Sequence, residues 1–278
     1  MKIFNTKQAL QQYLLQCRQN GKTIGLVPTM GALHNGHLSL IKQAQQKCDV
    51  TVCSIFVNPT QFTNADDLKN YPRPIEADIT KLESVNCDIL FNPEVTEMYA
   101  ANEQWHIDLG QLEHLLEGKF RPGHYQGVTQ VVYKLFDIVK PDYAFFGQKD
   151  YQQYLVIDKM VQLLNLPVKL VMCPIEREAD GLAMSSRNIH LTADDHAHAL
   201  VLSKALAYIK DNFNGSNLSE VTHSAGEMVR NQQGVTLEYL EIADGETLQP
   251  ATDESAHLVA LTAAQVGKTR LIDNMIIR

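Results

Sequence analysis

The sequence is poor in the features that mark secreted, membrane and zinc-binding proteins. Its 5 cysteines among 278 residues are scattered and form no C-x-x-C pair, which argues against a disulfide framework and against a zinc site. We interpret them as small free thiols in the core or on the surface. No apolar run is long enough to span a membrane, and residues 1–6 lack the apolar core of a signal peptide. We therefore expect a cytoplasmic protein.

Basic side chains and several well-known catalytic motifs are also scarce. Lys and Arg number 24 against 32 Asp and Glu, whereas a nucleic-acid-binding protein normally carries a basic face. The chain contains no G-x-S-x-G elbow, no Walker A loop, no G-x-G-x-x-G and no cysteine in a nucleophile setting. We therefore expect neither nucleic-acid binding nor a covalent enzyme intermediate. A mechanism that relies on positioning and electrostatics needs none of these motifs.

The first part of the chain alternates strand-like and helix-like segments. Strands are expected at residues 23–27, 50–57, 89–91, 143–146 and 168–173, and helices at residues 37–47, 75–85, 128–139 and 151–164. Pro28 should end the first strand, because proline cannot donate to a sheet. The order predicts parallel β-α-β units, and the apolar strands predict cover on both faces: an α/β fold with a doubly wound parallel sheet. Ligands of such a sheet collect beyond the carboxyl ends of its strands.

Beyond about residue 175 the pattern changes. Thr192 as N-cap and Asp195 in the capping-box position predict the start of a long helix that runs to about Lys210. A second helix should follow to Gln233, and strands are expected at residues 235–242, 257–264 and 269–277. We therefore expect two domains, at residues 1–175 and 176–278, of which the second is a smaller α+β C-terminal domain.

The run His34-Asn35-Gly36-His37 is the strongest candidate for a functional site. It follows an expected strand and opens an expected helix, so His37 should lie where free backbone N–H groups and the helix dipole attract anions. The alternatives are two metal ligands on one helical face or two unrelated surface histidines, and the glycine between them and the lack of a nearby Cys or carboxylate disfavour the metal pair. The strand-turn-helix context therefore predicts a phosphate-binding turn.

Three further polar segments lie at expected strand ends or between the two domains. Residues 58–61 offer amides that suit hydroxyls and carboxylates, although alone they are more simply an Asn-Pro turn. Lys149 and Asp150 can meet a phosphate and Mg²⁺, or else pair as surface charges. Residues 184–188 can clamp a polyphosphate, or else form a polar loop.

Together, four segments resemble the pantothenate synthetase (pantoate–β-alanine ligase) family. They are residues 28–37 (PTMGALHNGH), 54–62 (SIFVNPTQF), 146–153 (FGQKDYQQ) and 180–188 (DGLAMSSRN), in the family's order and across essentially the whole chain. The family belongs to the nucleotidyltransferase superfamily, whose histidine signature is shared with class I aminoacyl-tRNA synthetases. The resemblance implies a Rossmann-like nucleotidyltransferase fold and a cytoplasmic homodimer.

The resemblance also implies a reaction. Family members use ATP and Mg²⁺ to join pantoate to β-alanine. The pantoate carboxylate attacks the α-phosphorus of ATP, which releases pyrophosphate and leaves pantoyl adenylate. The amine of β-alanine then displaces AMP and forms pantothenate.

Site residues follow from the same resemblance. It implies four catalytic residues, of which His37 is the proton donor: His34, His37, Lys149 and Arg187. It implies that ATP is bound by Met30, Gly31, Ala32, Leu33, His34, Asn35, Gly36, His37, Gly147, Gln148, Lys149, Asp150, Glu176, Met184, Ser185, Ser186 and Arg187. Gln61 and Gln153 would hold pantoate, Gln61 would also lie beside β-alanine, and Asp150 would lie near the metal. Residues 184–187 would close over the phosphates.

Two positions depart from the family pattern. Gln148 stands where Glu is more usual, which removes a charge beside Lys149. Glu176 stands where an apolar residue is usual and where the backbone meets adenine, a contact that survives a change of side chain.

Two alternatives remain open. A nucleotidyltransferase that adenylylates a phosphorylated acceptor without ligation would need a cationic acceptor pocket, whereas the amides of Gln61 and Gln153 suit a small hydroxy acid. A catalytically silent nucleotide-binding module would bind ATP without releasing AMP.

Overall fold

The computed structural model describes residues 1–101, 103–253 and 255–278. The chain forms two compact units, which we describe separately. Unit 1 comprises Met1–Gly147 and Val156–Pro174, and unit 2 comprises Gln148–Leu155 and Ile175–Arg278. The short segment Gln148–Leu155 thus groups with the second unit, although it precedes the boundary expected near residue 175.

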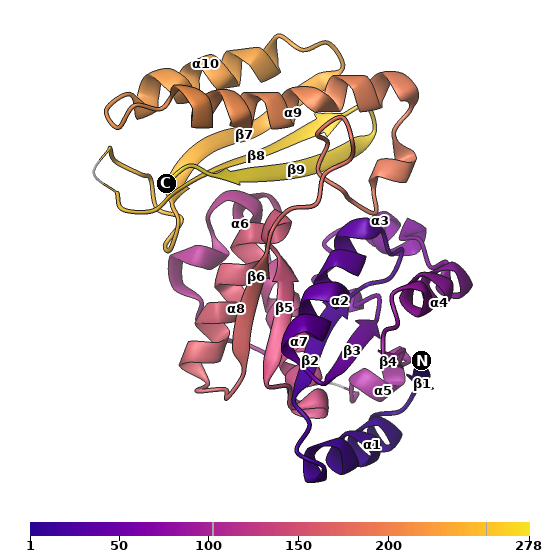
Figure 1. The fold of residues 1–278 in the computed structure, drawn as a ribbon. Coiled ribbons are helices and arrows are strands. Elements are labelled where there is room, and N and C mark those ends of the chain that lie inside the picture. Colours follow the sequence, from indigo (N-terminus) through magenta and orange to yellow (C-terminus); the bar gives the residue numbers. More distant parts are fainter. Residues whose placement is uncertain (102, 254) are drawn as a thin grey trace. The chain divides into compact units, whose positions relative to one another are not determined.

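A parallel sheet of six strands forms the centre of unit 1 (Figure 1). The strands are β1 (Lys2–Phe4), β2 (Ile24–Thr29), β3 (Val50–Ile55), β4 (Ile89–Phe91), β5 (Tyr143–Gly147) and β6 (Lys169–Cys173). They stand in the order β1-β4-β3-β2-β5-β6, so the order reverses between β2 and β5. In sheets of this kind, ligands bind outside the carboxyl ends of the strands at that reversal.

Helices cover both faces of this sheet. The helical segments that precede β6 are α1 (Lys7–Gln19), α2 (Asn35–Lys47), η1 (Pro59–Gln61), α3 (Ala65–Asn70), α4 (Ile75–Ser84), α5 (Val95–Met98), η2 (Gly110–Glu113), α6 (Leu116–Phe120), α7 (His124–Val139), η3 (Gln148–Asp150) and α8 (Tyr151–Leu163). Phe145 of β5 packs in one cluster with Ile41 of α2 and Leu82 of α4. The next residue, Phe146, meets Phe136 of α7 on the opposite face, with ring centroids 6.5 Å apart. The predicted doubly wound parallel sheet is confirmed.

Unit 2 is built on an antiparallel sheet of three strands, β7 (Val235–Asp244), β8 (Leu258–Val266) and β9 (Thr269–Ile276). Helices α9 (Ala193–Asn212) and α10 (Leu218–Arg230) lie along one face of it (Figure 1), and the short η4 (Asn188–His190) precedes them. The predicted capping box is present: the Asp195 N–H donates to Thr192 Oγ1 at 3.1 Å, and the Thr192 N–H donates to Asp195 Oδ2 at 3.4 Å. The expected α+β class of this part is confirmed.

The prediction that Pro28 ends the first strand was wrong. Strand β2 continues to Thr29, and Pro28 pairs with Ser54 of β3. The carbonyl of Ile24 accepts from Asp142 N–H at 2.9 Å, so the backbone of Ile24 faces β5. Alternate residues of a strand face the same neighbour, so the backbone of Pro28, four residues later, also faces β5. Pairing of β2 with β5 covers Gly25 and Leu26, so no partner requires the N–H that Pro28 lacks.

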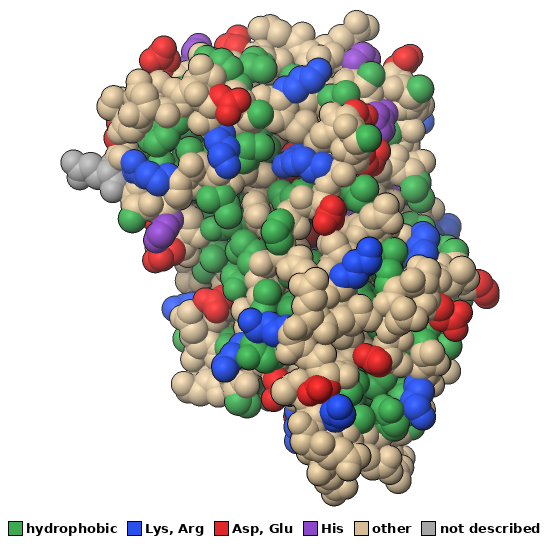
Figure 2. Space-filling view, viewed as in Figure 1, with side chains coloured by type: hydrophobic (Ala, Val, Ile, Leu, Met, Phe, Trp, Pro, Cys, Tyr) green, Lys and Arg blue, Asp and Glu red, His purple; other side chains and the backbone are tan. Residues whose placement is uncertain are grey.

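The described surface and core agree with the composition. Figure 2 shows Lys and Arg side chains interspersed with Asp and Glu over the face in view. Within the described residues, none of the helices combines the length and apolar character needed to cross a membrane. All five cysteines are free and buried.

Candidate active site

The turn after β2 has backbone geometry that few side chains adopt. Gly31 has a φ of 84° and Ala32 a φ of 50°, both in the left-handed region. A Cβ atom on Gly31 would lie 3.0 Å from Ile55 Cγ2, so this position requires glycine. The turn delivers His34 to the N-cap of α2 and His37 to its first turn, as predicted.

Both imidazoles are oriented by the backbone of their own turn. The Gly36 N–H donates to His34 Nδ1 at 3.2 Å, and the His34 N–H donates to His37 Nδ1 at 3.3 Å. The two rings lie side by side, with centroids 4.0 Å apart. Because Nδ1 accepts in each ring, a neutral imidazole carries its proton on Nε2. This is the donor arrangement that a phosphate oxygen requires.

Asp78 of α4 holds the turn in place. Its carboxylate accepts from Ala32 N–H at 2.8 Å and from Leu33 N–H at 2.7 Å, and it is 1% exposed. Lys81 Nζ, one turn further along α4, donates to the Leu33 carbonyl at 2.6 Å. Asp78 therefore stabilises the left-handed residue at the centre of the turn.

Gln61 lies at the same edge of the sheet as the histidines. Strands β2 and β3 are paired to their ends, where Thr29 lies opposite Ile55, and η1 follows β3. Gln61 is 8% exposed, and Nδ1 of the buried His124 lies 2.8 Å from its carbonyl oxygen. A Cβ atom on Gly127 of α7 would lie 2.3 Å from the Thr60 carbonyl oxygen, so this glycine permits the close contact of α7 with η1.

In unit 2, the segment after β5 is held by the end of β9. Asn274 Nδ2 donates to the carbonyls of Gln148 and Lys149, both at 2.9 Å, and Gln148 Nε2 donates to Asn274 Oδ1 at 3.1 Å. The amide at position 148 thus supplies a donor that a carboxylate lacks. Asp150 is exposed, and Gln153 is half-buried in the first turn of α8. The predicted ATP segment therefore has its backbone fixed by an amide 125 residues away.

The second predicted phosphate segment of unit 2 belongs to a tight loop. Arg177 bridges Ala183, and the Met184 N–H donates to the Glu176 carbonyl at 3.0 Å. Arg177 also forms a bidentate salt bridge with Asp273, at 2.7 and 3.0 Å. Since Asp273 precedes Asn274, one end of β9 holds this loop and the segment after β5.

Asn188 closes the loop that carries the predicted clamp residues. Its Nδ2 donates to Glu178 Oε1 at 2.6 Å and to the Ala183 carbonyl at 3.1 Å. The Arg187 N–H donates to Ser185 Oγ at 3.2 Å. Ser185, Ser186 and Arg187 are all half-buried. The clamp segment is therefore an ordered turn with polar side chains that reach the surface.

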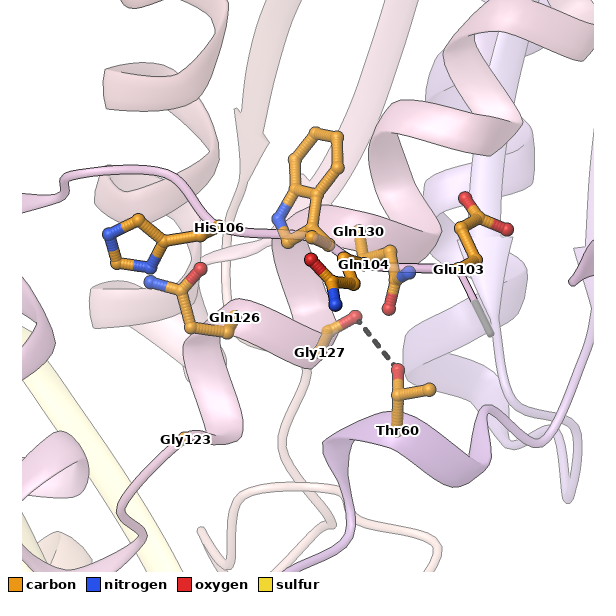
Figure 3. A pocket seen from close by; sticks show the side chains of 9 residues that line it. Thr60, Glu103, Gln104, His106, Gly123, Gln126, Gly127 and Gln130 are labelled. Atoms are coloured by element: carbon orange, nitrogen blue, oxygen red, sulfur yellow. Dashed lines mark hydrogen bonds between the residues drawn. The ribbon is translucent and has the colours of Figure 1, made fainter. Parts of the chain in front are cut away.

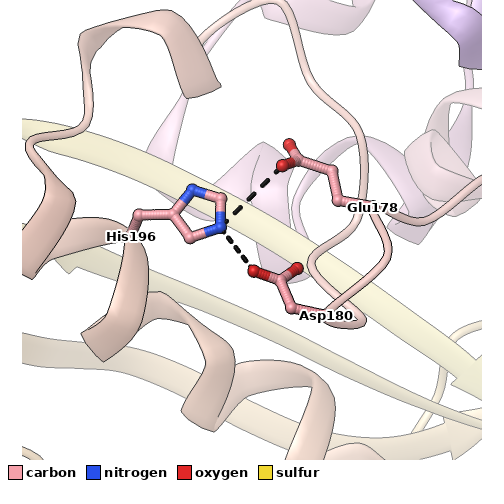
Figure 4. Close-up of side chains that lie close together, drawn as sticks. All are labelled: Glu178, Asp180 and His196. Atoms are coloured by element: carbon pink, nitrogen blue, oxygen red, sulfur yellow. Dashed lines mark hydrogen bonds and ion pairs between the residues drawn. The ribbon is translucent and has the colours of Figure 1, made fainter.

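A carboxylate-imidazole cluster joins this loop to α9. His196 Nε2 is 2.7 Å from Asp180 Oδ2 and 3.8 Å from Glu178 Oε2 (Figure 4). Among the described residues, this is the single group of three His, Cys, Asp or Glu side chains close enough to share a metal ion. The hydrogen bond between imidazole and carboxylate accounts for the closeness by itself, and it lowers the pKa of Asp180.

The predicted site residues thus fall into two groups. Residues 30–37 and Gln61 lie at one edge of the parallel sheet of unit 1, while residues 148–150, Gln153, Glu176 and residues 184–187 belong to unit 2, and Gly147 ends β5. Four residues that hold these groups were not predicted from the sequence: the buried Asp78, Asp273 and Asn274, and the half-buried Arg177. The sequence offered two signals for them. Asp78 is an acid on the apolar face of a predicted helix, and Asp273 and Asn274 are adjacent polar residues in an apolar predicted strand.

Comparison with known proteins decides the family. The model of a family described as pantoate-beta-alanine ligase matches residues 2–276. The chain belongs to this family. This ligase is 46% identical over 277 residues to the pantothenate synthetase of Porphyromonas gingivalis, covering 99% of each chain. It is 45% identical over 279 residues to that of Fervidobacterium nodosum, covering 100% of this chain and 99% of the relative.

Solved structures agree with the sequence relatives. This ligase matches the pantothenate synthetase of Thermus thermophilus with a TM-score of 0.94 and 39% identity, covering 100% of this chain and 99% of that one. It matches the pantoate-beta-alanine ligase of Francisella tularensis with a TM-score of 0.82 and 37% identity, covering 99% and 97% of the two chains. The Francisella enzyme was crystallised with beta-gamma ATP and β-alanine. The resemblance drawn from four sequence segments is confirmed.

Proposed function

We propose that this ligase condenses pantoate with β-alanine to form pantothenate, AMP and diphosphate at the expense of ATP. The observation that carries the proposal is the family match over residues 2–276. The Nε2 donors of the histidine turn, placed at the N-terminus of α2, support phosphate handling at one part of the site.

The first step is adenylation of the acid. A carboxylate oxygen of pantoate attacks the α-phosphorus of ATP, the bond to the bridging oxygen breaks, and pyrophosphate leaves with the electron pair. Charge builds on the phosphoryl oxygens, and His34, His37, Lys149 and Arg187 are proposed to stabilise it as hydrogen-bond and charge donors. His37 is proposed to donate its Nε2 proton to the leaving group.

The second step is transfer of the acyl group. The neutral amine of β-alanine attacks the carbonyl carbon of pantoyl adenylate, the carbon–oxygen bond to phosphate breaks, and AMP departs. The amine loses a proton as the amide forms. The enzyme's part in this step is to hold the two reactants together and exclude water.

The remaining assignments concern substrate contacts. Gln61 and Gln153 are proposed to bind pantoate, and Gln61 also β-alanine. ATP is proposed to contact residues 30–37, 147–150 and 184–187, with the Glu176 backbone at adenine. We propose that residues 1–175 bind ATP and pantoate, and that residues 176–278 act as the smaller lid domain.

Asp150 is the proposed protein ligand of Mg²⁺. It is an exposed carboxylate, and no group of three metal-binding side chains includes it among the described residues. Mg²⁺ in ATP-dependent enzymes is commonly held by one or two carboxylates and the substrate phosphates, so a single carboxylate fits this ion. When bound, Mg²⁺ would neutralise charge on the phosphates.

The proposed assembly is a homodimer, and the proposed location is the cytoplasm. Light scattering during size-exclusion chromatography measures the mass directly against the 31.2 kDa of one chain. A mass near twice this value supports the dimer, and a mass near 31.2 kDa contradicts it.

One incubation tests the reaction. The protein is mixed with ATP, Mg²⁺ and pantoate, with and without β-alanine, and the products are analysed by mass spectrometry. We expect pantoyl adenylate without β-alanine, and pantothenate with AMP when it is present. A stable dinucleotide formed with a phosphorylated acceptor would favour adenylylation without ligation, and ATP binding without AMP release would favour a silent module.

A further inference from the structure

Asn58 is a fully buried polar side chain with partners at both ends of its amide. Its Oδ1 accepts from the Tyr99 hydroxyl at 2.6 Å, from Thr60 Oγ1 at 3.0 Å and from Thr60 N–H at 3.3 Å. Its Nδ2 donates to Gln61 Oε1 at 3.0 Å and to the Gly127 carbonyl at 3.1 Å. With 0% of its surface exposed, Asn58 acts on the site through its neighbours.

The backbone fixes which way the Asn58 amide points. The Thr60 N–H can only donate and the Gly127 carbonyl can only accept, so Oδ1 must face the first and Nδ2 the second. The amino group then also meets Gln61, and it holds Oε1 of Gln61 toward Asn58. Nε2 is therefore the remaining end of the Gln61 amide, and it is a donor.

Tyr99 brings a contact from a distant part of the chain. It follows α5 and lies 41 positions from Asn58 in the sequence. Lys134 Nζ lies 5.2 Å from the centre of the Tyr99 ring, and it also donates to Glu103 at 2.8 Å. Burial raises the pKa of Tyr99 to about 12, so its hydroxyl stays protonated at neutral pH. Tyr99 is thus a fixed donor to Asn58.

A cavity of about 670 Å³ adjoins this network. Thr60 and Gly127 line it together with Gln126 and Gln130, and Figure 3 shows the hydrogen bond from the Thr60 hydroxyl to the Gly127 carbonyl. Because the turn borders a hollow here, side-chain packing does not enclose it on that side. Asn58 therefore holds the turn of residues 58–61 by hydrogen bonds where it borders the cavity.

We propose that Tyr99 is a positioning residue for the acid substrate. Its hydroxyl holds Asn58, and Asn58 holds the Gln61 amide with its Nε2 donors directed to an acceptor oxygen of the acid. The inference rests on the proposed function, in which Gln61 binds pantoate. The inference adds that Nε2 of Gln61 selects an acceptor on the substrate, namely a carboxylate, hydroxyl or carbonyl oxygen, and disfavours a donor group.

Tyr99→Phe removes the hydroxyl and keeps the ring. We expect a rise of about three- to tenfold in the KM for pantoate, the effect of one neutral hydrogen bond, with the KM for ATP unchanged. The matched control is Tyr133→Phe, because the Tyr133 ring packs at a tilt against Trp105, with centroids 5.0 Å apart, and lies outside the Asn58 network. Initial rates with each substrate varied in turn measure both constants, and thermal unfolding checks that each variant folds.

A double-mutant cycle tests whether Tyr99 acts through Gln61. Gln61→Ala should raise the KM for pantoate, and adding Tyr99→Phe to it should cause no further rise. A rise that persists in the Gln61→Ala background would overturn the inference, as would an unchanged KM in Tyr99→Phe alone. If Gln61→Ala itself leaves the pantoate KM unchanged, the proposed substrate contact of Gln61 fails, and the inference fails with it.

A second variant covers the case in which Tyr99→Phe does not fold. Asn58→Asp replaces the amino group that faces Gln61 by an acceptor oxygen, so the Gln61 amide must turn its donors toward position 58. We expect at least a tenfold rise in the pantoate KM, since an acceptor then faces the acid's acceptor oxygen. A pantoate KM equal to that of the parent protein would contradict the assigned amide orientation.

Discussion

The two histidines differ in what holds them, although their rings lie side by side. His34 caps α2 through Nδ1, whereas His37 is inside the helix and receives the His34 N–H. Because a backbone N–H occupies Nδ1 of each ring, Nε2 is the ring nitrogen that can donate to a ligand. The chemistry of this turn follows from four consecutive residues, which is why the sequence alone indicated it.

His37→Ala should slow adenylation by roughly 10²–10³-fold, the usual cost of one preorganised donor to a developing charge. Pyrophosphate exchange into ATP that depends on pantoate measures this half-reaction. His223→Ala is the control, because His223 is exposed on α10. Near-normal exchange in His37→Ala would remove its proposed role.

Asp78→Asn should disturb the turn at Ala32 and Leu33, which is proposed to bind ATP, without changing side-chain size. The asparagine amide has only one acceptor oxygen, so its amino group must face either the Ala32 N–H or the Leu33 N–H. Two donors then face each other, and one hydrogen bond is lost. We expect a stability loss of roughly 1.5–3 kcal/mol, typical of a hydrogen bond to a charged group, and a higher KM for ATP. Urea unfolding and initial rates measure the two effects. Asp66→Asn, at an exposed position, should change neither, and an unaltered KM for ATP in Asp78→Asn would show that the turn keeps its form without the carboxylate.

Residues that hold the site are harder to predict than residues that form it. Asp78 contacts backbone atoms 45 and 46 positions away, and Asn274 contacts carbonyls 125 and 126 positions away. Local periodicity shows that such polar residues sit among apolar ones, but their partners depend on the tertiary fold. The motif residues of the predicted site were therefore accessible from the sequence, and their supports were not.

At the scale of elements, one glycine sets how closely α7 approaches η1. Gly127→Ala would place a methyl group 2.3 Å from the Thr60 carbonyl oxygen, so η1 must move. We expect a higher pantoate KM and a loss of stability, measured by initial rates and thermal unfolding. Gly226→Ala is the matched helical control, because its Cβ meets the flexible end of Arg230. That substitution should be neutral or stabilise by about 0.5–1 kcal/mol, and equal effects of the two would contradict the steric argument.

Three secondary-structure elements were predicted wrongly or not at all from local sequence patterns: the end of β2, strand β1 and helix α1. Pro28 lies inside β2 because the backbone pairing of β2 with β5 covers only Gly25 and Leu26, which the sequence does not reveal. Strand β1 has three residues, too few for a periodic signal. Helix α1 carried a readable signal that was overlooked: Leu10, Leu14 and Cys17 are buried at helical spacing, and Thr6 caps its start.

The loop that carries Arg187 is tied to α9 through a titratable pair. The hydrogen bond from His196 lowers the pKa of Asp180, so the pair stabilises the fold above the ordinary carboxyl pKa near 4 and loses this effect as pH falls through the lowered value. We expect His196→Ala to raise the pKa of Asp180 in a carboxyl NMR titration. Asp49, whose pKa is lowered by hydrogen bonds from Thr23, should not respond. An Asp180 pKa that stays low in the variant would assign the shift to another cause.

At the scale of the whole molecule, the two units have separate cores. Leu206 and Val266 belong to the core of unit 2, while Ile41 and Phe145 belong to that of unit 1. All five cysteines lie in unit 1, and each is at most 9% exposed. Thiol chemistry therefore reports on the integrity of unit 1 in the folded chain.

We expect the native protein to resist thiol reagents at pH 8. Burial raises the pKa of Cys48, Cys87 and Cys173 to about 11 and that of Cys53 well above its ordinary value, so the reactive thiolate is scarce even where a reagent can enter. Reaction with a chromogenic disulfide should be slow in buffer, and all five thiols should react at once in guanidinium. Saturating ATP should slow the native reaction further, because ligand binding to the folded state opposes the opening that exposes the thiols. Rapid reaction of two or more thiols in the native protein would contradict the burial on which this expectation rests.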